Sequence, residues 1–264
     1  MRLLAAAGDD AKILAGGQSL MPMLNLRLAR PDLLIDINRA DQRAPSLDGN
    51  HLRLPALTRH RVAAEHDLVR QHCPLLADAI RYVGNVRVRN RGTIGGSLAH
   101  ADPTAEIGCC ALATGALVVA RGPDGDRTIP ASDLFAGYWS TTLAEAEIIT
   151  DVLIPVARPR QGWSFHEMVR RTSDFAIVAV AVILNLAERD GVIAAATVAL
   201  AGVADRVVLA DPQPPDGDPD EIAARIAETL DPPDDVHASG AYRRRLARVL
   251  TARALREASA RAAL

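Results

Sequence analysis

The sequence of 264 residues is poor in aromatic residues, in cysteine and in lysine. Only 3% of the residues are aromatic although 49% are hydrophobic, so we expect a core built from aliphatic side chains. The three cysteines, Cys73, Cys109 and Cys110, include no C-x-x-C pair. Because an iron–sulfur cluster needs four suitably placed ligands, this chain cannot hold one alone, and we expect buried core thiols and no metal site.

Long apolar runs and a strong net charge are missing as well. No apolar run reaches the ~18 residues of a membrane-spanning helix. The formal net charge of −2 argues against nucleic acid or an anionic membrane as a partner. The apolar start at residues 1–7 is too short for a secretory leader, and we expect a cytoplasmic chain. A G-x-G-x-x-G fingerprint is absent too, which argues against ordinary nicotinamide binding.

What the sequence does contain is a glycine pair early in the chain, in the stretch KILAGGQSL at residues 12–20. Apolar residues before the pair predict the end of a strand, and residues 21–28 predict a helix with Pro22 in its first turn. A strand, two glycines, a hydroxyl and a helix direct backbone N–H groups to one place, where a phosphate can bind. A plain strand-to-helix turn without a ligand is the alternative.

A second glycine pair repeats this chemistry about 80 residues further along. The stretch RGTIGGSLAHADPTAE, residues 91–106, has hydroxyls on both sides of the pair, then small residues and a carboxylate. Two such loops could hold opposite sides of a dinucleotide pyrophosphate.

The two loops resemble the signature pair of a known family. AGGQSL at 15–20 and TIGGS at 93–97 are similar to the loops of the FAD-binding (medium) subunit of molybdenum hydroxylases. That family includes the carbon monoxide dehydrogenase medium subunit and the FAD domain of xanthine dehydrogenase. Further matching segments follow in the family's order and, with the loops, cover most of residues 12–205: LIDINR (34–39), ALTRH (56–60), EIITDVLIP (147–155) and RRTSDFAIVAVAV (170–182).

The resemblance implies an α+β fold in two parts. Residues 1–156 would form a PCMH-type FAD-binding domain, similar to that of vanillyl-alcohol oxidase. Residues 163–264 would form a small α+β C-terminal domain with an antiparallel sheet and helices, after a connector rich in proline and arginine. Compared with the family, the first strand is expected to be missing at the N-terminus, which would leave a sheet edge unpaired.

The resemblance also names residues that contact the FAD pyrophosphate. They come from both glycine loops: Ala15, Gly16, Gly17, Gln18 and Ser19 from the first, and Thr93, Gly95, Gly96 and Ser97 from the second. Ser97 stands where many relatives carry asparagine, a change that shortens the side chain but keeps a donor.

Three further residues are implied at the flavin, each with an ordinary structural alternative. Glu106 would hydrogen-bond flavin or ribose oxygens, or else interact with a helix N-terminus. Ile149 would pack on the isoalloxazine, or else face the core from a strand. His166 stands where some relatives place lysine near the pyrimidine edge of the flavin, or else is a surface histidine. We expect no metal ligand, and no catalytic side chain, on this chain.

The function implied is that of an electron-transfer subunit. It would take electrons from a [2Fe–2S] small subunit and pass them through FAD to an external acceptor, while a molybdopterin large subunit oxidises the substrate. The expected assembly is a dimer of heterotrimers that meets a membrane only through the complex. Two alternatives stay open: a stand-alone FAD-dependent oxidoreductase, and a scaffold subunit without flavin.

Periodicity and turn residues predict the remaining elements. In the first part we expect strands at 33–37, 52–54, 117–119, 127–129 and 147–154, and helices at 59–69 and 74–83, with Thr58 as an N-cap. In the second part we expect strands at 175–187 and 192–201 joined by a turn at 188–191, a loop at 211–219, and helices at 219–230 and 239–263. The last helix would bury Tyr242, Leu246, Val249, Leu250 and Leu255 and leave its arginines in solvent.

Overall fold

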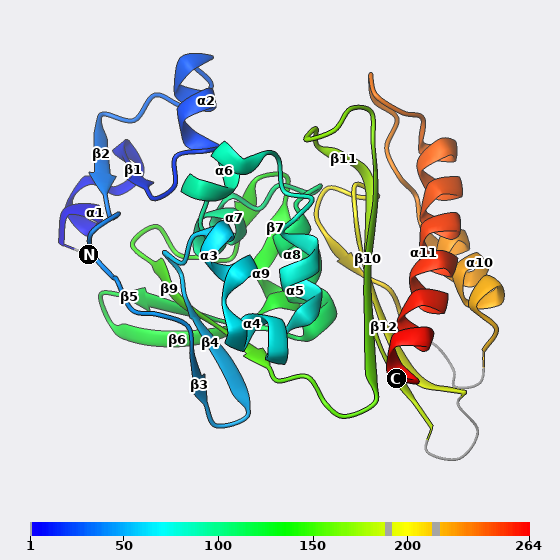
Figure 1. Ribbon diagram of the computed structural model, residues 1–264. Coiled ribbons are helices and arrows are strands. Elements are labelled where there is room, and N and C mark those ends of the chain that lie inside the picture. Colours follow the sequence, from blue (N-terminus) through cyan, green and yellow to red (C-terminus); the bar gives the residue numbers. More distant parts are fainter. Residues whose placement is uncertain (1, 188–191, 213–216) are drawn as a thin grey trace.

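The computed structural model describes residues 2–187, 192–212 and 217–264. Figure 1 shows three regions side by side: a small N-terminal lobe, a middle region of short helices over a sheet, and a C-terminal sheet with two helices on its outer face. The predicted α+β fold is confirmed.

The N-terminal lobe is built on two short parallel strands. Its elements are α1 (Arg2–Ala7), the 3-10 helix η1 (Gly8–Asp10), β1 (Ala11–Leu14), α2 (Leu20–Asn25) and β2 (Leu33–Asp36). Lys12 of β1 pairs with Leu34 of β2. Pro22 lies in the first turn of α2, as predicted, but the helix ends earlier than residue 28 because Arg27 has a φ of 58°.

The middle region contains an antiparallel five-stranded sheet in the order β3-β4-β9-β5-β6. Its strands are β3 (Ser46–Asp48), β4 (His51–Pro55), β5 (Leu117–Gly122), β6 (Gly125–Pro130) and β9 (Ile148–Pro155). The predicted hairpin and the predicted strand at 147–154 are confirmed. Between β6 and β9 lie three short elements: α9 (Ala131–Leu134), β7 (Phe135–Gly137) and β8 (Ser140–Thr141).

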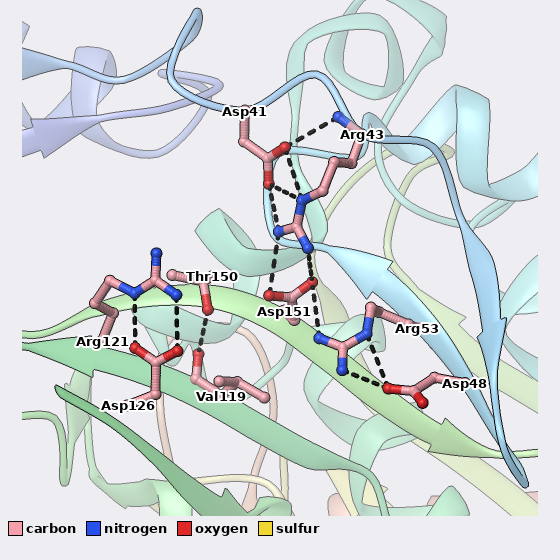
Figure 2. A network of polar contacts seen from close by, with 9 residues as sticks. All are labelled: Asp41, Arg43, Asp48, Arg53, Val119, Arg121, Asp126, Thr150 and Asp151. Atoms are coloured by element: carbon pink, nitrogen blue, oxygen red, sulfur yellow. Dashed lines mark hydrogen bonds and ion pairs between the residues drawn. The ribbon is translucent and has the colours of Figure 1, made fainter.

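A charged cluster on this sheet fastens the segment that leads from the N-terminal lobe. Asp151 of β9, whose side chain is only 6% exposed, forms ion pairs with Arg43 (3.0 Å) and Arg53 (3.5 Å). Figure 2 shows Arg43 between Asp151 and Asp41, and Arg53 between Asp151 and Asp48. The pairs at Asp151 tie residues 41–43 to the centre of the sheet.

Six short helices lie between the lobe and the C-terminal sheet. They are α3 (His60–Glu65), α4 (Asp67–His72), α5 (Pro74–Ala79), α6 (Val86–Arg91), α7 (Ile94–His100) and α8 (Glu106–Thr114). The single helix predicted at 59–69 is wrong: the backbone is extended at His66, whose side chain accepts the N–H of Leu68 and begins a new helix. The N-cap role of Thr58 is also wrong, because Arg59 occupies that position.

The C-terminal region is an antiparallel sheet in the order β10-β11-β12-β13, followed by two helices. Its elements are β10 (Gln161–Val169), β11 (Ala176–Leu186), β12 (Ile193–Ala201), β13 (Val208–Leu209), α10 (Pro219–Thr229) and α11 (Gly240–Ala262). The two long strands and both helices are where the sequence predicts them. The predicted turn at 188–191, and residues 213–216 of the predicted loop, lie outside the described residues.

The two faces of this sheet carry side chains of different size. On β11, Ala179 and Ala181 belong to the core shared with the middle region, whereas Val180 and Val182 belong to the core under α10 and α11. This alternation follows from the two-residue period of a strand. Small side chains on the inner face let α8 pack against β11 and β12.

Helix α11 departs from its prediction at three positions. Leu246, Leu250 and Leu255 are buried as expected, but Tyr242 and Val249 are 43% and 40% exposed. Arg243 is buried rather than solvated: its guanidinium donates to the main-chain oxygens of Ile177 and Gly202 and pairs with Asp235. The guanidinium therefore satisfies two main-chain oxygens, one at the start of β11 and one just after β12.

The cysteines are buried and free, as predicted. Burial raises the pKa of the Cys73 thiol to about 12 and raises that of Cys109 further. Within the described residues, no group of three or more histidine, cysteine or acidic side chains is arranged to hold a metal ion. No helix in the same part of the chain is long and apolar enough to cross a membrane.

Candidate functional site

The structure brings the two glycine loops into direct contact. A Cβ atom on Gly16 would overlap the carbonyl oxygen of Arg91 and would lie 2.9 Å from the Cα of Gly92. A Cβ atom on Gly96 would lie 3.8 Å from the Cβ of Ala15. Glycine at position 16 is therefore required by the approach of one protein loop to the other.

The first loop, residues 15–19, leaves its main-chain donors available. Within the part of the chain that the structure describes, the N–H groups of residues 16–19 have no hydrogen-bond acceptor. Gly17 has a φ of 73°, which favours glycine, and the Ser19 side chain makes no capping bond. Four consecutive unpaired N–H groups form a set of donors suited to an anion.

The second loop, residues 92–97, uses its main-chain donors within the protein. The N–H groups of Ile94 and Gly95 donate to the main-chain oxygens of Thr58 (3.0 Å) and Ala56 (2.8 Å). Those of Gly96 and Ser97 donate to the hydroxyl (3.1 Å) and the main-chain oxygen (3.0 Å) of Thr93. A Cβ on Gly95 would lie 2.5 Å from the Cβ of Ala56, so this glycine serves close packing.

A buried histidine supports the second loop. His60 is 4% exposed, and a Cβ on Gly92 would lie 2.9 Å from its Nδ1 atom. Burial lowers the pKa of His60 to about 4, so the ring is neutral near pH 7. The neutral ring of His60 therefore packs against the second loop at Gly92.

Two carboxyl groups lie near the boundary between α8 and the C-terminal sheet. Glu106 is the first residue of α8, and burial raises its pKa to about 7. Burial and the negative charge of Glu106 raise the pKa of Glu167, on β10, to about 8. One oxygen of Glu167 is buried and, among the described residues, has no hydrogen-bond partner. The region beyond the second loop therefore favours protonated carboxyl groups.

Ile149 lies on β9, which packs against α7 beside the second loop, whereas His166 lies on β10 in the C-terminal sheet. Ile149 is 7% exposed on β9, opposite Ala120, and belongs to the core of the middle region. His166 pairs with Glu257 of α11 at 2.8 Å, so it lies on the outer face of the C-terminal sheet. The next residue, Glu167, lies on the inner face. Glu167 was not predicted from the sequence, although the two-residue period of the strand at 161–169 was the available signal.

The residues present fit an anionic dinucleotide at the meeting point of the loops. The first loop offers unpaired N–H groups, and Arg59 and Arg91 lie beside it with their positive charges. The first loop, residues 15–19, contains no acidic residue that would repel an anion. This donor set suits the diphosphate of FAD.

Comparisons with known proteins agree with this fit. The family model described as "FAD binding domain in molybdopterin dehydrogenase" matches residues 1–157. The chain belongs to the FAD-binding medium subunits of the molybdenum hydroxylases. A second model, described as "CO dehydrogenase flavoprotein C-terminal domain", matches residues 163–213 and 217–258 of this medium subunit. It is thus an FAD-dependent oxidoreductase subunit.

Curated relatives extend over nearly the whole chain. Subunit alpha of the 6-hydroxypseudooxynicotine dehydrogenase complex of Paenarthrobacter nicotinovorans is 37% identical, covering 99% of this chain and 91% of that protein. The carbon monoxide dehydrogenase medium chain of Hydrogenophaga pseudoflava is 39% identical, covering 69% of this chain and 64% of that protein.

Solved structures share the fold of this medium subunit. Carbon monoxide dehydrogenase from Hydrogenophaga pseudoflava has a TM-score of 0.91 at 33% identity, covering 98% of this chain and 93% of that one. Quinoline 2-oxidoreductase from Pseudomonas putida 86 has a TM-score of 0.89 at 33% identity, covering 100% and 94%.

Proposed function

We propose that this chain is the electron-relay subunit of a three-subunit molybdenum hydroxylase. It takes electrons from a [2Fe–2S] small subunit and passes them through FAD to an external acceptor, while a molybdopterin large subunit oxidises the substrate. Relatives named as the medium or alpha subunits of such enzymes support the proposal. We propose a dimer of heterotrimers in the cytoplasm, with membrane association only through the complex.

The observation that carries the FAD-binding part of the proposal is the set of N–H groups on the first loop that have no acceptor among the described residues. Residues 16–19 donate to the diphosphate of FAD, next to Ala15 and the Ser19 hydroxyl. Thr93, Gly95, Gly96 and Ser97 stay proposed contacts of the diphosphate from the second loop, where the hydroxyl of Ser97 would donate. When bound, FAD supplies the redox chemistry, and the chain supplies binding and orientation.

At the flavin end, Glu106 is proposed to hydrogen-bond flavin or ribose oxygens. Its raised pKa makes it a hydrogen-bond donor below about pH 7. Ile149 stays a prediction for the contact with the isoalloxazine. His166 stays a prediction as well, but its contact with Glu257 on the outer sheet face argues against it.

The division of the chain is part of the proposal. We assign residues 1–156 to the FAD-binding domain and residues 163–264 to the C-terminal domain. The ranges matched by the two family models support this division. The same matches, and the available donors of the first loop, favour a subunit that holds flavin over a stand-alone oxidoreductase or a flavin-free scaffold.

The source of the electrons is the part of the proposal to test. The isolated chain, loaded with FAD under nitrogen, is mixed with excess NADH and separately with a reduced [2Fe–2S] partner chain. We expect the flavin absorption band to bleach only with the partner, because this chain has no nicotinamide fingerprint. Rapid bleaching by NADH alone, or no response to the partner, would contradict the relay role.

A further inference from the structure

One side chain joins the N-terminal lobe to the second loop. The guanidinium of Arg59, in the residue before α3, donates to the main-chain oxygen of Arg91 and to Oδ1 of Asn38 at 2.6 Å. Asn38 follows β2 and is itself fixed, since its main-chain and side-chain N–H groups donate to Asp36. Arg59 therefore reaches from the middle region into the lobe that carries the first loop.

The atom that Arg59 holds is the one on which the first loop rests. The carbonyl oxygen of Arg91 occupies the space that a Cβ on Gly16 would need. The backbone beside it is fixed too, because the N–H of His60 donates to Gly92 at 3.0 Å and Arg59 forms a β-bridge with Thr93. The side chain of Arg59 adds the link to Asn38 that this backbone pairing lacks.

The charges around Arg59 are not balanced within the protein. Burial and the nearby Arg91 lower the pKa of Arg59, and Asp36 acts in the opposite direction. An anion bound at the first loop would stabilise both cations. This charge pattern agrees with a diphosphate near the place where the loops meet.

We propose that Arg59 is a positioning residue for FAD: by holding both Asn38 and the carbonyl of Arg91, it sets how the first glycine loop rests on the second. The proposal depends on the proposed binding of the FAD diphosphate at the first loop. Arg59 acts through the loop, because its two donated bonds go to protein atoms.

The test uses the full chain and three variants, Arg59→Ala, Arg59→Lys and Arg43→Ala. Arg43 is the matched control, since it also ties the segment after the lobe to the sheet but bonds to neither loop. FAD affinity is measured by quenching of flavin fluorescence, and folding of the FAD-free variants by thermal unfolding. We expect Arg59→Ala to weaken FAD binding by about tenfold or more, because two charge-assisted hydrogen bonds are lost.

Arg59→Lys should bind with intermediate affinity, because an ammonium keeps the charge but cannot span both acceptors as a planar guanidinium does. Arg43→Ala should bind FAD as the wild type does. Wild-type affinity in Arg59→Ala would overturn the proposal, and so would an equal loss in Arg43→Ala, which would assign the effect to attachment of the lobe. If the wild-type chain bound no FAD, the proposed function itself would fail.

Discussion

The two glycine loops have similar sequences but different hydrogen bonding. In the first loop the N–H groups of residues 16–19 have no acceptor among the described residues, whereas in the second loop those of residues 94–97 are all bonded within the protein. Gly16 is needed where the loops touch, and Gly95 is needed where the second loop packs on Ala56. The same pattern, a glycine pair with a hydroxyl nearby, thus offers free N–H donors to a ligand in the first loop. In the second loop it forms a rigid support for the first loop.

The carbonyl groups around each loop explain the difference. Residues 56–58 run beside the second loop and offer the oxygens of Ala56 and Thr58 to its N–H groups. The first loop lies at the end of β1, where the pairing with β2 stops after Leu14 and Asp36. An N–H group that is buried without an acceptor costs free energy. A bound anion would therefore act as the acceptor that the protein does not provide for the first loop.

The largest effect on FAD binding is expected from one methyl group added to the first loop. Gly16→Ala should weaken FAD binding by about a hundredfold, or ~3 kcal/mol, because the Cβ would push the loop off the Arg91 carbonyl. The FAD-free chain should still fold, with its thermal stability lowered because the contact between the loops is disturbed. Gly8→Ala in the same lobe is the control for backbone strain alone, since its φ of 53° disfavours a side chain but no described atom lies within 4 Å of a Cβ there. A Gly16→Ala variant that keeps its flavin through gel filtration would contradict the account.

A glycine-to-alanine change in the second loop should mainly lower the free energy of unfolding. Gly95→Ala places a methyl group against Ala56, inside the core of the middle region, and should lower the free energy of unfolding by about 1–3 kcal/mol. Thermal unfolding of the FAD-free variant measures this loss. The comparison would fail if this variant unfolded like wild type and had lost only its affinity for FAD.

A smaller effect should come from the carboxyl groups beyond the second loop. Glu106 and Glu167 have pKa values of about 7 and 8, above the ordinary value of 4.5, so the folded chain keeps protons that the unfolded chain has released. The free energy of unfolding of the FAD-free chain should therefore fall as the pH rises from about 4.5 to about 8.

Glu167→Gln should reduce this fall by about 1–2 kcal/mol, allowing for the partial exposure of the side chain. Denaturant unfolding at pH 5.5 and pH 8 measures it. Glu145→Gln is the control, because Glu145 is exposed. A pH slope identical in wild type and Glu167→Gln would show that this carboxyl is not protonated in the folded chain.

The sequence predicted what depends on local pattern. The strands around Val180 and Val198 and the helix predicted at 239–263 follow from periodicity, and the structure has them. The break at His66 was missed, because residues 59–69 have helical character on both sides of it. Burial of Arg243 was missed too, since its acceptors on Ile177 and Gly202 lie far away in the sequence.

The position of the candidate site could be predicted from the sequence. Which loop offers free N–H donors and which loop packs within the protein could not. Both loops could be found from their glycine pairs and from the resemblance to a family. That Gly95 donates to Ala56, 39 residues earlier in the chain, depends on tertiary structure. Which of two neighbours on β10, His166 or Glu167, faces the inner side depends on strand register, and the resemblance to the family pointed to His166, which faces the outer side.

Amide hydrogen exchange of the FAD-free and FAD-loaded chain tests the central claim most directly. We expect the amides of residues 16–19 to exchange rapidly without FAD and to become protected when FAD binds. Those of residues 94–97 should already be protected without FAD and change little, because their hydrogen bonds lie within the protein. Rapid exchange at 94–97 that slows with FAD, together with no change at 16–19, would contradict the account.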